Sequence, residues 1–131
     1  MYESLILVDP DARLDAEALA SELLRFYTGK SDRPDVVLSG ETIKLIWPTY
    51  HFIIHYSCAP HVVIESREIA ARFGMTHAAK DRIAHAQARF ETSAPDDPEM
   101  AYFNDYLYIG EAAERKGPVF RFDQSSATFL E

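Results

Sequence analysis

The first third of the chain contains a continuous apolar run, which is followed by apolar residues at helical spacing. Leu5–Val8 is a short run of branched residues ended by an Asp-Pro-Asp turn, which predicts a buried strand. Apolar residues then recur every three or four positions between residues 14 and 28, which predicts a helix. Asp11 or Asp15 can cap its start, and Gly29 lies where a left-handed residue would end it.

From residue 35 to residue 57 the hydrophobic period changes to two, which predicts an antiparallel meander. The predicted strands are Val36–Leu38, Thr42–Trp47 and Tyr50–Ser57. In the third strand, aromatic residues occupy one face, whereas His51 and His55 belong to the other. We expect the aromatic face to pack against helices, because rings gain the most from burial.

The second half of the chain combines helical and alternating segments. Helical spacing predicts helices over residues 60–73 and 76–91, and Asp97 is placed to cap a short helical turn over 99–104. Alternation over 106–109 and 119–123 predicts a terminal hairpin. The expected fold is a single α+β domain over residues 1–131: a mostly antiparallel, meandering sheet with the helices packed on one face. A ferredoxin-like plait is a variant if one middle strand proves to be an edge.

Charge is distributed unevenly along the chain. Thirteen basic residues against 21 acidic residues give a net charge of −8, which argues against a phosphate backbone as the main partner. Residues 41–95 are nearly balanced, with five acids and six bases, and they hold all five histidines. Both flanking segments are acidic. Nucleic acid is therefore an unlikely partner, and a basic protein is a more natural one.

Cysteine content and the N-terminal pattern favour the cytoplasm. The single cysteine, Cys58, has no second cysteine with which to form an internal disulfide. The first residues lack the basic region of a signal peptide, and no apolar stretch reaches the roughly 20 residues that span a bilayer. We therefore expect a soluble, cytoplasmic protein without membrane association.

Two short segments resemble known families. Ile6-Leu7-Val8-Asp9-Pro10-Asp11 resembles the end of the first strand in receiver domains, where carboxylates hold a metal. Turn formation by Asp9 and helix capping by Asp11 are the favoured interpretation of the two aspartates. Residues 66–76, Ser-Arg-Glu-Ile-Ala-Ala-Arg-Phe-Gly-Met-Thr, resemble the first helix and turn of a bacterial helix-turn-helix. That resemblance implies a DNA-binding regulator through residues 66–90, using Arg67, Arg72 and Arg82.

The histidines and Cys58 do not predict a metal or catalytic centre. His51 and His55 are four apart on a strand and so about 13 Å apart, well beyond the spacing of two ligands on one zinc ion. No nucleophile elbow and no glycine-rich phosphate loop occur. We expect no cofactor and no metal, and the pattern favours a protein that is not an enzyme.

Acidic and aromatic residues alternate near the C-terminus. The candidate partner-binding residues are Asp96, Asp97, Glu99, Tyr102 and Asp105. Carboxylates steer the approach of a basic protein and rings supply contact area, so the leading hypothesis is a non-enzymatic interaction module. Small acidic domains of this class include toxin-immunity proteins and regulators, an analogy of class alone.

Two further hypotheses stay open from the sequence. The first is a small-molecule or enzymatic site between sheet and helices that uses His51, His55 and Tyr56. The second is a homodimer, formed when an exposed edge strand pairs two copies of the chain. It is compatible with either function.

Overall fold

The computed structural model describes residues 2–130, which form seven strands and four helices. In chain order they are β1 (Tyr2–Val8), α1 (Ala16–Tyr27), β2 (Asp35–Ser39), β3 (Thr42–Trp47), β4 (Tyr50–Ser57), α2 (Pro60–Phe73), α3 (Lys80–Ala84), β5 (Ala88–Ala94), α4 (Phe103–Lys116), β6 (Val119–Asp123) and β7 (Thr128–Leu130). The predicted α+β class is confirmed. So is the predicted antiparallel sheet, because every pair of neighbouring strands is antiparallel.

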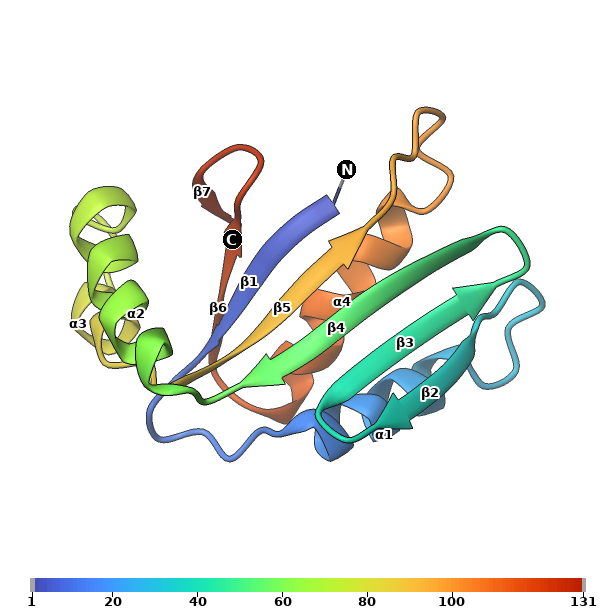
Figure 1. The fold of residues 1–131 in the computed structure, drawn as a ribbon, viewed down its shortest axis with the longest axis horizontal. Helices are drawn as coiled ribbons and strands as arrows, with labels where there is room; N and C mark the ends of the chain where they lie inside the picture. Colours follow the sequence, from blue (N-terminus) through green and yellow to red (C-terminus); the bar gives the residue numbers. More distant parts are fainter. Residues whose placement is uncertain (1, 131) are drawn as a thin grey trace.

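The strands form one sheet in the order β2-β3-β4-β5-β1-β6-β7 (Figure 1). Within it, β1-α1-β4-β5-α4-β6 follow the βαββαβ order of a ferredoxin-like plait, and their four strands are neighbours in the order of that fold. The plait variant therefore describes the inner part of the sheet. The β2-β3 hairpin, the α2-α3 pair and β7 are additions to it.

Side chains on β1 alternate between two hydrophobic clusters, one on each face of the sheet. Ile6 and Val8 belong to the larger cluster, which includes the buried residues of α1 and α4. Leu5 and Leu7 belong to a smaller cluster with Ile69 of α2 and residues of α3. The expectation that all helices share one face therefore needs correction. Because β1 is apolar on both sides, it requires a cover on each, and α2 and α3 supply the second.

On the second face, α2 and α3 cover β1 and β6, and α2 also contacts β5 through the Glu65–Arg89 pair. Figure 1 shows α1 and α4 crossing behind the sheet. Helices α2 and α3 lie at the left, on the side of β1, β6 and β7, so no helix lies in front of β2, β3 and β4. We name this uncovered surface the open face. Its side chains, fixed by strand register, are those of Val37, Lys44, Ile46, His51, Ile53 and His55.

Residues 88–94 form β5 in the centre of the sheet, where the sequence predicted the end of a helix. The predicted helix from residue 76 is reduced to the five residues of α3. Ala86 and Phe90 fit helical spacing, but Arg89 and Glu91 alternate with Phe90 in the manner of a strand. Pairing with both β1 and β4 outweighs the helical spacing.

Residues 103–116 form α4, where the sequence predicted a strand over 106–109. Tyr106, Ile109 and Ala113 are spaced by three and four positions and are all buried against α1 and the sheet. Residues 106–109, Tyr-Leu-Tyr-Ile, also favour a strand, so the helical period is not apparent from the sequence alone. The terminal hairpin exists, but its two strands are β6 and β7.

Candidate functional site: an acidic, tyrosine-rich end of the sheet

The acidic residues singled out in the sequence gather at one end of the sheet. β5 ends there, α4 begins there, and the β3-β4 turn and the loop after α1 lie at the same end, as strand register requires. We name this region the acidic end. It comprises Asp32, Asp96, Asp97, Glu99 and Asp105.

Asp97 organises the loop that leads into α4. Its carboxylate accepts a hydrogen bond of 2.6 Å from the Tyr2 hydroxyl and bonds of 3.0 and 2.8 Å from the backbone N–H groups of Ala101 and Tyr102. Burial opposes ionisation, but these donors outweigh it and lower the pKa of Asp97. The sequence expectation that Asp97 caps a helical turn is therefore close to its observed role, since it binds the last two N–H groups before α4.

Asp105 lies in the first turn of α4 and accepts a hydrogen bond of 2.6 Å from the hydroxyl of buried Tyr27. Burial raises the pKa of Asp105, and the neighbouring carboxylates of Asp32 and Asp97 raise it further against the opposing hydrogen bond. This shift shows that the carboxylates lie within one another's field. Their negative charge is therefore concentrated at this end.

Aromatic side chains beside the β3-β4 turn pack against Tyr102, in the loop between β5 and α4. Tyr102 stacks on Tyr50, with ring centroids 4.2 Å apart and planes 4° apart, and its ring also meets Trp47 at 5.0 Å. The Tyr50 hydroxyl donates a 2.6 Å hydrogen bond to the carbonyl of Pro95. Burial, with help from Asp97 and Asp96, raises the pKa of Tyr50 to about 12, so this donor stays protonated.

One apolar side chain projects from this loop into solvent. Met100 is 59% exposed, and its backbone has a φ of 55°, a left-handed conformation that is costly for any residue but glycine. The turn between Asp97 and Met100, closed by a 3.0 Å backbone hydrogen bond, holds the residue in that conformation. An exposed methionine between carboxylates offers apolar contact area within a charged surface.

The structure thus brings together the five candidate partner-binding residues and adds others that the sequence did not indicate. Asp97, Tyr102 and Asp105 make structural contacts, and the side chains of Asp96 and Glu99 are exposed in the loop. Asp32 joins them from the loop after α1. The sequence around Asp32 does not indicate that it belongs to this region. Only the packing of α1 beside α4 brings Asp32 close to Asp105.

His51, His55 and Tyr56 do not form one site. His51 and His55 lie on the open face but line separate hollows, of about 540 and 380 Å³. Tyr56 belongs to the opposite face, where its ring packs 5.1 Å from that of Phe90. The His55 ring nitrogen Nδ1 lies 3.0 Å from the Thr42 hydroxyl, a cross-strand hydrogen bond.

The hollow beside His55 contains a charged cluster. Arg89 of β5 is only 5% exposed and pairs with Glu91 at 2.8 Å and with Glu65 of α2 at 2.7 Å. Glu91 lies directly opposite His55 in the strand register, so an imidazole and a carboxylate share this hollow. The Arg89–Glu65 pair also ties α2 to the centre of the sheet.

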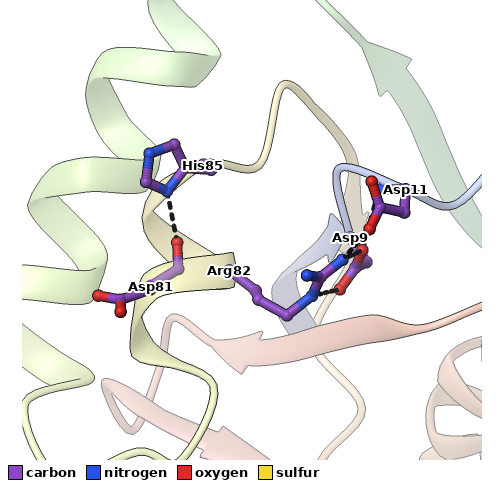
Figure 2. A network of polar contacts seen from close by, with 5 residues as sticks. All are labelled: Asp9, Asp11, Asp81, Arg82 and His85. Carbon is purple, nitrogen blue, oxygen red and sulfur yellow. Dashed lines mark hydrogen bonds and ion pairs between the residues drawn. The ribbon is translucent and has the colours of Figure 1, made fainter.

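A second polar network lies at the opposite end of β1 (Figure 2). Arg82 of α3 donates to both carboxylate oxygens of buried Asp9 and, at 2.7 Å, to Asp11. The Arg82 hydrogen bonds, joined by the N–H of Asp11, lower the pKa of Asp9 in spite of burial. His85 bonds within its own turn to the carbonyl of Asp81 at 2.6 Å.

This network bears on both resemblances noted in the sequence. Asp9 and Asp11 bind an arginine, and Asp15, not Asp11, caps α1 through the N–H of Ala18. The expected second helix of a helix-turn-helix is replaced by five-residue α3 followed by β5. Arg82, expected to face DNA, is held against Asp9.

Among residues 2–130, no group of three histidine, cysteine or acidic side chains is arranged to hold a metal ion. No helix in that range is long and apolar enough to cross a membrane. Comparison with protein-family models, curated proteins and solved structures found no match to this chain.

Proposed function

We propose that this protein is an interaction module that binds a basic protein through its acidic end. The observation that supports the proposal most directly is the gathering of acidic side chains at this end, where exposed Asp96 and Glu99 lie on the loop between β5 and α4 and Asp32 and Asp97 lie close enough to Asp105 to help raise its pKa. A cluster of like charges costs free energy in the isolated protein. A cationic partner would relieve that repulsion on binding.

The shape of the loop suits such a partner. Asp96 and Glu99 are exposed on the same short loop as Met100, so charge and apolar area lie together. Lysine or arginine side chains of the partner would meet the carboxylates, and their aliphatic stems would pack on Met100. The stacked rings of Tyr50 and Tyr102 give the loop a firm base, which limits the entropy lost on binding.

The experiment compares three immobilised proteins as baits for a cytoplasmic extract at low salt. They are the wild type, an acidic-end variant (Asp96→Asn with Glu99→Gln) and a charge-matched control (Glu17→Gln with Glu68→Gln), whose two sites are exposed elsewhere. We expect the wild type and the control to recover one basic protein, the acidic-end variant to recover much less, and salt to release it.

Three results would contradict the proposal. They are equal recovery by all three baits, a partner that raised salt does not release, and no basic protein on the wild-type bait at low salt. The purified partner then allows titration calorimetry against the same three proteins. A preserved fold in each variant, checked by thermal unfolding, separates lost binding from lost structure.

A second candidate function rests on the hollow beside His55. Its lining combines His55, Glu91 and buried Arg89, so it presents both charges to a small polar ligand. In a thermal-shift screen of metabolites, a true ligand should raise the melting temperature of the wild type and of His51→Ala, which lines the other hollow, but not of His55→Ala. A screen without any stabilising metabolite counts against this candidate.

A further inference from the structure

The two edges of the sheet differ in how they are protected. β7 is only three residues long, and short edge strands are one way in which proteins avoid edge-to-edge pairing. β2 has five residues, and no charged residue follows Asp35 within it. Val37 and Leu38 are 42% and 41% exposed. β2 is therefore a bare apolar edge.

The hydrogen-bonding groups of this edge follow from the hairpin. Ser39 and Thr42 close a two-residue turn in which Gly40 has a φ of 60°, and the closing residues of such a turn bond to each other. The bond from the Tyr56 N–H to the Glu41 carbonyl fits the same alternation on β3. Asp35, Val37 and Ser39 thus point their backbone groups toward β3, and Val36 and Leu38 point theirs outward.

Helix α1 extends the apolar edge on the covered side of the sheet. Leu24, 57% exposed, lines a hollow of about 370 Å³ together with Val36, Pro34 and Arg33. Val36 and Leu38 lie on this same side of β2. A strand added beside β2 would therefore cover apolar side chains as well as complete the backbone ladder.

We propose that β2 pairs with β2 of a second copy of this chain, antiparallel, with a twofold axis at Val37. Val36 then lies opposite Leu38 of the second copy, and these are the two residues whose N–H and C=O groups point outward. Symmetry gives two such pairs and four hydrogen bonds between the copies. Val37 meets its own counterpart on the open face, and Asp35 meets Ser39, so no like charges oppose each other.

Charge complementarity identifies a second copy as the occupant. Continuing the same register places Arg33 beside Glu41 of the second copy, and the symmetry repeats this pair. Both side chains are exposed, and neither forms an ion pair within the described residues 2–130. Opposite charges at equal distances on either side of Val37 suit self-pairing, because each copy supplies what the other needs.

Sedimentation equilibrium over a range of protein concentrations tests the edge. Leu38→Lys puts a protective charge on β2, and Ile64→Lys, at a 58% exposed site on α2, is the matched control. We expect a dimer for the wild type and the control. Leu38→Lys should raise the dissociation constant at least about tenfold, since each substitution counts twice in a symmetric dimer. A monomeric wild type, or a Leu38→Lys dimer as tight as the wild type, overturns the proposal.

A charge exchange tests the register and the identity of the occupant. Arg33→Glu and Glu41→Arg should each raise the dissociation constant about threefold to tenfold by setting like charges together twice. The double variant should restore the wild-type value. Single variants without effect, or a double variant weaker than either single one, overturn the twofold register at Val37. The acidic-end variant (Asp96→Asn with Glu99→Gln) leaves β2 unchanged. If it fails to bind a basic partner, the result of the dimerisation test is not affected.

Discussion

Aspartates at the two ends of the sheet meet opposite surroundings. At the end of β1, Arg82 neutralises Asp9 and lowers its pKa. At the acidic end, burial and neighbouring carboxylates raise the pKa of Asp105. In the first arrangement a buried carboxylate has a cationic partner, and loss of that partner would leave a buried charge unpaired. In the second, Asp97 and Asp105 accept hydrogen bonds from Tyr2 and Tyr27, while neighbouring carboxylates raise the pKa of Asp105.

The largest effect should come from removing Asp9. Asp9→Ala deletes an acceptor of charged hydrogen bonds and of the Asp11 N–H, so we expect a loss of about 2–4 kcal/mol in the free energy of unfolding. Urea denaturation measures it. Asp11→Ala, which changes an exposed carboxylate bound to the same Arg82, is the control and should cost less than about 1 kcal/mol. Equal losses for the two variants would mean that the burial of Asp9 does not make its carboxylate more important for stability than the exposed carboxylate of Asp11.

The same pair predicts how stability depends on acid. A carboxyl whose pKa is lowered on folding stabilises the protein above its ordinary pKa of 3.8, and that contribution is lost as pH falls through the lower, folded value. Asp9→Asn cannot titrate, so its deficit relative to the wild type should be full at neutral pH and shrink below pH 3.8. Urea midpoints measured from pH 7 to pH 2 test this. A deficit independent of pH would remove the electrostatic explanation.

A smaller loss should follow Tyr27→Phe at the acidic end. The substitution keeps the buried ring but removes the hydroxyl that donates to Asp105, which costs about 1 kcal/mol. It should also raise the pKa of Asp105 further, since the hydroxyl bond favours the ionised form. Carboxyl chemical shifts followed by NMR during acid titration report that pKa. No change in either quantity would show that the bond does not form in solution.

The smallest effect, of opposite sign to that at Asp9, should come from Asp105→Asn. A carboxyl whose pKa is raised on folding costs stability as pH rises from its ordinary value through the folded one. We therefore expect the variant to equal or exceed the wild type at neutral pH, by less than about 1 kcal/mol. The difference should vanish below pH 3.8, where both carry a neutral group. A clear loss at neutral pH would show that the two ends do not differ as described.

The elements that could be predicted are those with one period and close partners in sequence. α1 and the three strands of the β2-β3-β4 meander follow local alternation and short turns, and the structure confirms them. β5 and α4 were assigned the wrong type because each has a second, competing pattern. Phe90 fits a helix with Ala86, and Tyr106 fits a strand with Tyr108. Only their distant neighbours decide between the patterns.

The candidate site could be predicted in part for the same reason. Asp96, Asp97, Glu99, Tyr102 and Asp105 are close in sequence, so their proximity follows from a loop and one helical turn. Asp32 reaches the same region only because α1 packs beside α4. The pairing of Arg82 with Asp9 joins residues 73 positions apart, and no pattern in either segment predicts it.

The central position of β1 has a consequence for synthesis of the protein. Its two neighbours, β5 and β6, begin at residues 88 and 119, so β1 leaves the ribosome well before the strands that pair with it. Leu5–Val8 must stay unpaired while most of the chain is made, which favours slow folding and exposure to chaperones. A nascent chain halted before residue 88 should therefore lack the central pairing that joins its two halves.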